Sequence, residues 1–152
     1  MRKSMAVFIA LAVLAAGGAA WAATTTVAVT ASVVGTCQVT NTNGDPLVAF
    51  GQLDQVGAPP VNGIVTQPTF WCTKNTTYTI GDDLGANDAA GAYRMTNGED
   101  FIAYNFTYTA SAPGTGKTTP ITMDIAASIP AGTYSDVTAG NYSDSILLTI
   151  NP

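Results

Sequence analysis

Apolar and polar residues alternate with a period of two along much of the chain after residue 22. The three clearest runs span residues 24–34, 101–109 and 145–150. Their apolar faces comprise Val27, Val29, Ala31 and Val33; Ile102, Tyr104, Phe106 and Tyr108; and Ile146, Leu148 and Ile150. Because successive side chains of a strand point to opposite faces, this pattern predicts β-strands with one buried face each. No later window has the i, i+3, i+4 spacing of an amphipathic helix, so we predict an all-β protein.

Shorter β-rich runs lie between the clear ones. We predict strands at residues 36–40, 47–53, 64–73, 76–81, 93–96 and 121–129, and loops at residues 41–46, 57–63, 81–91 and 111–119. Short strands at this spacing are typical of one β-sandwich domain, which would cover residues 35–152. The runs supply about six strands besides the N-terminal one, whereas an immunoglobulin-type sandwich has about seven. The count therefore predicts a sandwich that lacks its own last strand.

The first 22 residues have the three parts of a signal peptide. Arg2 and Lys3 are followed by an apolar run at residues 5–16 and a small-residue cleavage box at residues 20–22. The apolar run is shorter than the roughly 20 residues that a membrane-spanning helix needs. The sequence therefore predicts an exported protein whose mature chain begins at Ala23.

The mature chain would begin with a strand-like segment at residues 23–34 that no turn leads back into a hairpin. An unpaired strand with an apolar face invites pairing with another chain. One interpretation is a strand that is donated to a second molecule. The other is an ordinary first strand of the sandwich, and the segment alone does not decide between them.

Charge limits the partners of the mature chain. Only Lys74, Arg94 and Lys117 remain as bases against ten acidic residues, which gives a net charge of −7. Nucleic-acid binding requires basic patches that release counterions, and docking on anionic lipid requires clustered bases. We therefore expect no nucleic-acid partner.

The chain has two cysteines, Cys37 and Cys72, and no histidine. An even number of cysteines in an exported chain predicts a disulfide. This bond would close a loop of about 36 residues and destabilise the unfolded state by roughly 3–4 kcal/mol in the chain-entropy account. A metal site built on these cysteines is not expected, because the chain has neither histidine nor a Cys-x-x-Cys motif.

Two segments contain residue types that bind ligands in other proteins. Residues 111–118 resemble a phosphate-binding loop, but Ser111 replaces the first glycine and Pro120 prevents the helix that must follow. Residues 81–88 contain the oxygen-bearing side chains Asp82, Asp83, Asn87 and Asp88. Their spacing lacks the alternation of an EF-hand loop, so we predict a solvated turn, with Ca²⁺ binding as the alternative.

The sequence does not predict an enzyme. Without histidine, and with oxidised cysteines, the common nucleophile–base pairs are missing. Glu99 and Asp100 are adjacent after a turn, which does not suit a glycosidase pair, and no cofactor motif is present. Trp71 and Tyr93 are candidates for a carbohydrate-binding platform, but their strand-like context favours the core.

Five short motifs occur in an order that matches a known family. They are Val33-Val-Gly-Thr-Cys37, Val48-Ala-Phe-Gly51, Phe70-Trp-Cys72, Tyr78-Thr-Ile80 and the tail Ala139-Gly-Asn-Tyr-Ser-Asp-Ser-Ile-Leu-Leu-Thr-Ile150. Together they resemble the spore coat protein U domain, the subunit family of archaic (Csu-type) chaperone–usher pili. The resemblance covers residues 23–152, and the tail is its most specific part.

The resemblance implies an incomplete immunoglobulin-like β-sandwich that is completed by a strand from another chain. A periplasmic chaperone would lend this strand first, and the N-terminal strand of the next pilin subunit would replace it at an outer-membrane usher. The expected donor residues are Val27, Val29, Ala31 and Val33, and the expected acceptor-groove residues are Ile146, Leu148 and Ile150. The protein would pass through the periplasm to an extracellular fibre that supports adhesion and biofilm formation.

One departure from the family pattern is a duplicated Gly-x-Tyr-Ser-Asp motif at residues 132–136 and 140–144. We expect Tyr142 to be the family's corner tyrosine, because the last strand follows it directly. The alternative to the pilin reading is a self-contained secreted coat or matrix sandwich. A single domain favours a shaft subunit over a tip adhesin, which usually has an added binding domain.

Overall fold

A computed structural model describes residues 22–152 of the chain, so nearly all of the predicted signal peptide lies outside the described residues. The described part contains β-strands and no helix, which confirms the all-β prediction. The strands are β1 (Cys37–Val39), β2 (Leu47–Ala49), β3 (Val61–Asn62), β4 (Ile64–Thr66), β5 (Thr69–Cys72), β6 (Thr77–Asp82), β7 (Arg94–Thr96), β8 (Phe101–Ala103), β9 (Asn105–Thr107), β10 (Ser111–Pro113), β11 (Ile121–Thr122), β12 (Ala126–Ile129) and β13 (Leu148–Asn151). No helix among the described residues is long and apolar enough to cross a membrane.

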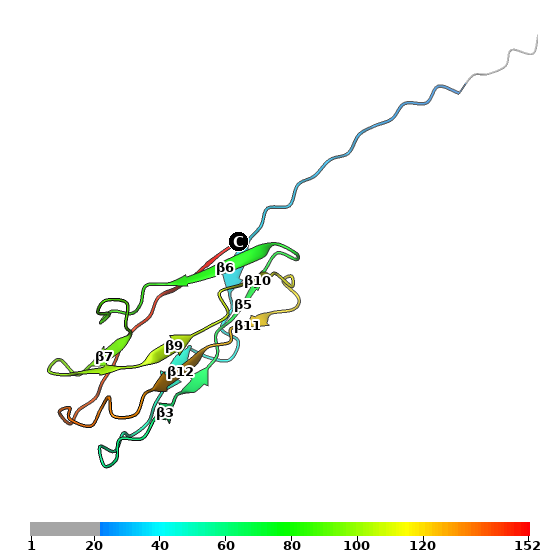
Figure 1. Cartoon of the computed structure of the whole chain (residues 1–152). Helices are drawn as coiled ribbons and strands as arrows, with labels where there is room; N and C mark the ends of the chain where they lie inside the picture. Colours follow the sequence, from blue (N-terminus) through cyan, green and yellow to red (C-terminus); the bar gives the residue numbers. More distant parts are fainter. Residues whose placement is uncertain (1–21) are drawn as a thin grey trace, which may run out of the picture. The chain divides into compact units, whose positions relative to one another are not determined.

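The strands form five short antiparallel sheets within residues 33–152 (Figure 1). Three sheets have three strands each, in the orders β1-β5-β11, β10-β6-β13 and β3-β12-β9, and two are the pairs β2-β4 and β7-β8. Neighbours in these sheets are often far apart in the sequence, as β13 and β6 are. The domain therefore depends on long-range pairings, which close slowly because their loop entropy must be overcome first.

Two clusters of buried apolar side chains form the core. The first contains Ala58, Met95, Ile102, Tyr104, Ile129 and Tyr134, and the second contains Phe70, Cys72, Tyr78, Ile80, Met123 and Ile125. Phe106 packs against both clusters and links them. Its ring lies 5.5 Å from that of Tyr93 and 5.9 Å from that of Tyr108, measured between centroids. The predicted inward face of residues 101–109 is confirmed, since Ile102 and Tyr104 are buried and Phe106 and Tyr108 are partly buried.

Three long strands predicted from the sequence are interrupted in the structure. Residues 64–73 divide into β4 and β5, residues 101–109 into β8 and β9, and residues 121–129 into β11 and β12. In each case the two halves belong to different sheets, so the break marks where the chain crosses from one sheet to the next. In residues 101–109 and 121–129 the apolar alternation continues through the crossing, so the pattern did not reveal it, whereas Pro68 marks the break in residues 64–73.

A side chain replaces the strand ladder at one of these crossings. Pro68 has no backbone N–H to donate, and Gln67 precedes it. The Gln67 side chain donates to the Ile125 carbonyl at 2.7 Å and accepts from the Ile125 N–H at 2.9 Å. The Gln67 side-chain amide thus links the crossings at residues 67–68 and 123–125 with the two hydrogen bonds that a backbone partner would make.

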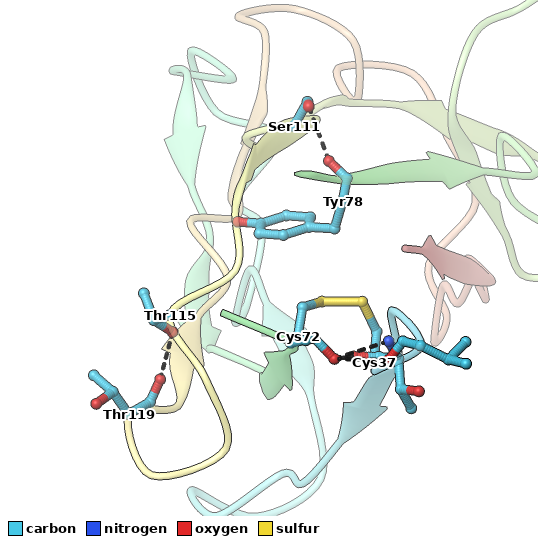
Figure 2. The surroundings of a disulfide bond; sticks show 9 residues. Cys37, Cys72, Tyr78, Ser111, Thr115 and Thr119 are labelled. Atoms are coloured by element: carbon cyan, nitrogen blue, oxygen red, sulfur yellow. Dashed lines mark hydrogen bonds between the residues drawn. A yellow bond between two sulfur atoms is a disulfide. The ribbon is translucent and has the colours of Figure 1, made fainter. Parts of the chain in front are cut away.

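The prediction of a flexible loop at residues 111–119 was wrong at its start. Residues 111–113 form β10 and pair with β6, and Ser111 donates to the Tyr78 carbonyl at 2.8 Å (Figure 2). Gly114 follows, at a point where an added Cβ would lie 2.3 Å from the Thr73 carbonyl oxygen. Only glycine permits this close backbone approach, and it fastens the loop to the end of β5.

Other boundaries also differ. Residues 61–62, predicted to lie in a loop, form β3, and the last strand begins at Leu148 rather than at residue 145. The predicted strand at residues 47–53 ends at Ala49, and Gly51 has a positive φ of 73°. This backbone conformation is left-handed, which ends a regular strand.

The predicted disulfide between Cys37 and Cys72 is confirmed (Figure 2). The two cysteines are direct partners in the β1–β5 register, and Cys72 is completely buried in the second core cluster. The bond fixes β1 to the core within a few residues of the N-terminal segment. We expect the disulfide to raise the free energy of the unfolded chain by roughly 4 kcal/mol, because it lowers the entropy of that state.

Candidate functional site

The last strand, β13, lies at the edge of its sheet. It pairs with β6, and its other edge has no strand partner in the described part of the chain. From residue 142 to residue 150, partly buried side chains alternate with exposed ones. The partly buried set comprises Tyr142, Asp144, Ile146, Leu148 and Ile150. Leu147, by contrast, points away from the core and has 66% of its surface exposed.

A groove runs beside the inward face of this segment. Its wide section has a volume of about 960 Å³ and is lined by most of residues 46–55 and by residues 137–146 and Leu148. Its narrow section, of about 200 Å³, extends to Ile150. Pro46, Ile146 and Leu148 line both sections, so the two sections adjoin.

Side chains of the protein core form much of the groove lining. In the wide section they are Met95, Ile102, Tyr104, Ile125 and Tyr134, and in the narrow section Thr69, Phe70 and Met123. These residues come from both core clusters, apart from Thr69. These core side chains form the floor of the groove, and at most 9% of the surface of each is exposed.

Other strands beside the groove also have a free edge. Among the described residues β2 pairs only with β4, and β1 pairs only with β5. After β2 ends, Phe50 and Leu53 still pack against the first core cluster. An apolar channel flanked by unpartnered strand edges can accept an extended segment, which adds ladder hydrogen bonds and fills the channel with alternate side chains.

The sequence-predicted residues Ile146, Leu148 and Ile150 do come together along this groove. The structure adds residues 46–55, which were predicted only as a strand and its preceding turn. The motif Val48-Ala-Phe-Gly51 marked this segment, but a motif does not state what a residue faces. The role of all these residues as acceptors of a strand stays a prediction.

The N-terminal segment, residues 22–32, forms no strand, and every residue in it is exposed. The segment predicted as a strand at residues 24–34 thus pairs with no strand in the described part of the chain, and its role as a donor stays a prediction. Val27 and Val29 have 77% and 91% of their surface exposed, and Val33, just beyond the segment, has 86%. Exposed valines in regular alternation leave apolar surface that association with a partner would bury.

The carboxylate of Asp144 lies in the lining of the wide section of the groove, shortly before β13. Asp144 accepts a hydrogen bond from the Tyr104 hydroxyl at 2.7 Å and from the Asn87 amide at 3.0 Å. Gly85, with a φ of 84°, passes so close that an added Cβ would lie 2.3 Å from an Asp144 oxygen. The second copy of the duplicated motif thus ties the last strand to the loop after β6.

The segment at residues 81–88 is more structured than the solvated turn predicted for it. Asp82 accepts hydrogen bonds from the Tyr108 hydroxyl at 2.5 Å, the Leu84 N–H at 2.8 Å and the Tyr93 hydroxyl at 3.1 Å. Asp83 accepts from the Leu147 N–H at 2.9 Å, so it binds the residue just before β13. Within residues 22–152 no group of three or more Asp, Glu, Cys or His residues is placed to hold a metal ion.

These contacts shift the pKa values of the groups involved. Partial burial acts to raise the pKa of Asp82, but hydrogen bonds from Tyr108, Leu84 and Tyr93 outweigh it and leave the pKa lowered. Burial and the bond to Asp82 raise the pKa of Tyr108 to about 12. The backbone N–H groups of Leu147 and Gly85 lower the pKa of Asp83. The ionised carboxylates are therefore the forms that the fold stabilises.

The two copies of Gly-x-Tyr-Ser-Asp have different roles. Tyr142 donates to the carbonyl of Thr138 at 2.8 Å, four residues upstream, as a corner tyrosine does. Tyr134 is almost completely buried, and its hydroxyl donates to the Pro59 carbonyl at 2.7 Å. The local bond agrees with the prediction for Tyr142, while Tyr134 serves the core.

The two candidate carbohydrate-binding aromatics do not form an exposed platform. Tyr93 packs against the rings of Tyr104 and Phe106 and donates to Asp82. Trp71 is partly buried in β5, with the Lys117 ammonium 5.8 Å from its ring centroid. Tyr93 therefore belongs to the core, as its strand-like context favoured, whereas Trp71 lies in neither core cluster.

Fold and groove together define an all-β domain with an unfilled strand position. A family model described as Spore Coat Protein U domain matches residues 23–149. The match covers most of the sequence, and the chain belongs to this family. No curated protein sequence matches the chain.

Among solved structures, the chain is similar to one described as the CsuC–CsuE chaperone–tip adhesion subunit pre-assembly complex from archaic chaperone–usher Csu pili of Acinetobacter baumannii. The sequences are 19% identical, with a TM-score of 0.43. The alignment covers 78% of this chain and 40% of the other. The chain thus spans about two fifths of the length of that structure's chain.

Replacement of Asp82 tests whether the carboxylate network holds the last strand's sheet together. Because the pKa of Asp82 is lowered in the folded state, its stabilisation is present above the ordinary pKa of about 4 and is lost as the pH falls through the folded value. Asp82→Asn should lower the melting temperature at pH 7 by about 3–5 °C, for roughly 1 kcal/mol after solvent screening. It should also flatten the fall in melting temperature between pH 5 and pH 2. Exposed Asp136→Asn is the control, and an equal effect of both variants would contradict this account.

Proposed function

We propose that this protein is a structural subunit of an extracellular bacterial pilus, assembled by the chaperone–usher pathway. Each copy accepts into its groove the N-terminal segment of another copy, residues 24–33. The observation that carries the proposal is the groove itself, which runs over core side chains beside the unpaired edge of β13. The chain also has an unpaired alternating segment, so it contains both parts of the proposed contact between subunits, the groove and the strand that fills it.

The dimensions of the two halves agree. Val27, Val29, Ala31 and Val33 span seven residues, which is roughly 20 Å of extended chain. The partly buried positions from Tyr142 to Ile150 span nine residues, so this face is long enough to take all four donor side chains.

The chemistry of the joint is the burial of apolar surface together with new backbone hydrogen bonds. The three valines are more than three quarters exposed. Burying each is worth roughly 1.5–3 kcal/mol before the cost of ordering the segment. Ladder hydrogen bonds to β13 add specificity, because the edge otherwise remains unpaired. No covalent chemistry is required, and we propose no enzymatic activity.

The empty groove of a single subunit is a hazard during export. A subunit with an empty groove would aggregate through its exposed apolar surface, so it needs a temporary strand from a periplasmic chaperone. An outer-membrane usher would then exchange that strand for the segment of the next subunit. Membership of the Spore Coat Protein U domain family supports this route. The resulting fibre on the cell surface would support adhesion and biofilm formation.

The donor segment can be tested by removal and relocation. Deleting residues 24–33 while keeping the signal peptide should leave a subunit that binds its chaperone but stops fibre growth, because it has a groove and no strand to give. Joining the same segment after Pro152 through a short flexible linker should produce a monomer much more heat-stable than the deletion variant, because the strand becomes intramolecular. Size-exclusion chromatography and thermal melting measure both results. A deletion variant that folds as a stable monomer without a chaperone would instead establish the self-contained secreted sandwich.

The groove face can be tested within a single strand. Leu148→Asp should abolish capture by the chaperone and lower the periplasmic level of the subunit, because the carboxylate would be buried unpaired in the groove. Leu147→Asp is the matched control, since Leu147 is the neighbouring residue and points outward. Co-purification with the chaperone and counting of fibres measure the effect. Normal fibres from Leu148→Asp would show that this face does not accept the strand.

A further inference from the structure

The segment proposed as a donor joins the domain through a short connection. Val33 is the last residue of the donor face, and Cys37 is bonded to the completely buried Cys72. Only residues 34–36 lie between Val33 and Cys37. The two Cα atoms can therefore be at most roughly 14 Å apart. A copy whose Val33 lies in the groove of a second copy must consequently lie directly against that copy.

The connection is also held in place by the domain. The Thr36 N–H donates to the Thr73 hydroxyl at 3.0 Å, and the Thr36 carbonyl accepts from the Thr73 N–H at 2.9 Å. An added Cβ on Gly35 would lie 3.0 Å from the Thr76 side chain and 3.6 Å from that of Pro152. The segment therefore leaves the domain beside the C-terminal end of β13.

This end of the domain has positive charge only, and we call it the basic end face. It consists of residues 34–36, 73–76, 114–117 and Pro152. Figure 2 shows its loop at residues 115–119 close to the disulfide. Lys74 and Lys117, two of the three bases of the mature chain, are exposed on this face. None of its residues is acidic.

The opposite end of the domain lies at the other end of the last segment. Ser143 pairs with Thr96 there, whereas Asn151 pairs with Thr79 near the basic end face. An extended chain covers up to roughly 25 Å between residues 143 and 151. Figure 1 accordingly shows β7, which contains Thr96, at the far end of the domain from the C-terminus.

Three loops at this opposite end form an acidic end face. Gln55 donates to the Val137 carbonyl at 2.6 Å, and Asp100 accepts from the Thr138 N–H at 2.7 Å, so the loops are joined to one another. They comprise residues 54–56, 97–100 and 136–140, and their acidic residues are Asp54, Glu99, Asp100 and Asp136. Residues 137–140 also line the wide section of the groove. Arg94, in the strand nearby, donates to backbone carbonyls of the loop that precedes it.

The positions of the two faces limit the direction in which a strand can enter the groove. A strand parallel to β13 would bring its own domain to the basic end face of the acceptor. The segment of the acceptor already leaves from that end, and lysines would face lysines. A strand antiparallel to β13 brings its domain to the wide section of the groove, where its lysines approach carboxylates.

We propose that the basic end face of one copy binds the acidic end face of the next copy, beside the filled groove. The inference rests on the proposed function and adds to the strand a second contact, between folded domains. With a net charge of −7, two mature chains repel each other overall, so the placement of the charges selects one direction of approach. Exposed ion pairs are individually weak, and the contact therefore acts mainly on the rate and orientation of assembly.

Charge reversal tests this contact in fibres that grow from the full mature chain. Lys74→Glu with Lys117→Glu should slow growth about 10-fold at low salt, because two acidic faces then meet. Glu99→Lys with Asp136→Lys should slow growth to a similar extent, because two basic faces then meet. The chain that carries all four changes restores opposite charges and should grow at a rate close to that of the parent. Light scattering measures the growth.

Two further variants control for net charge and for folding. Asp45→Lys with Asp124→Lys makes the same change in net charge outside both end faces, and it should not slow growth. Lys74→Gln with Lys117→Gln should remove most of the dependence of the growth rate on salt, since added salt screens only charges that attract each other.

A synthetic peptide with the sequence of residues 24–33 separates this contact from strand acceptance, because it has no charged residue and no end face. Its affinity is measured by fluorescence anisotropy on full chains that carry Val29→Asp and cannot donate. The affinity should be equal for the parent and all charge variants, which also shows that their grooves are folded. Unchanged growth of both reversed pairs, or slow growth of the four-change chain, would overturn the end-face contact and leave strand acceptance intact. A parent that neither binds the peptide nor forms fibres would remove the proposed function and this inference together.

Discussion

The last strand, β13, pairs on one edge only, and the other features of this protein depend on that constraint. An edge strand exposes unpaired backbone groups, and here it also lies beside a groove lined by side chains of both core clusters. The cost of this arrangement lies in the unpaired strand edge and in the apolar side chains of Ile146, Leu148 and Ile150, which are only partly buried. A strand from elsewhere removes both costs at once, which gives the proposed joint its strength and its direction.

The rest of the fold keeps the open strand in place. Asp83 accepts from the Leu147 N–H, and Asp144 accepts from Tyr104, so two carboxylates anchor the segment that leads into the last strand. The disulfide performs a similar task for β1. A groove that is held open before its ligand arrives loses less entropy on binding than one that must form around it. The acidic residues thus act as hydrogen-bond acceptors within the chain.

Much of this architecture could be predicted from the sequence. The features that could not be predicted depend on contacts between distant residues. Period-two alternation identified the inward faces of residues 101–109 and 145–150, because a half-buried strand imposes that pattern whatever its partner. The crossing between sheets at Tyr104 was missed, since alternation continues through it. The ordered start of residues 111–119 was missed because its order comes from Gly114 and its distant neighbour Thr73.

The central claim is that the groove of one copy holds the N-terminal segment of another, and intermolecular cross-linking tests it most directly. One chain carries Val29→Cys, and a second carries a cysteine at a groove position, in three versions, Ile146→Cys, Leu148→Cys and Ile150→Cys. The native cysteines are already oxidised with each other and do not compete. The account predicts a cross-linked pair of chains in assembled material for at least one groove version, and none for the outward-facing Leu147→Cys. Equal cross-linking at groove and outward positions, or none at any groove position, would contradict the account.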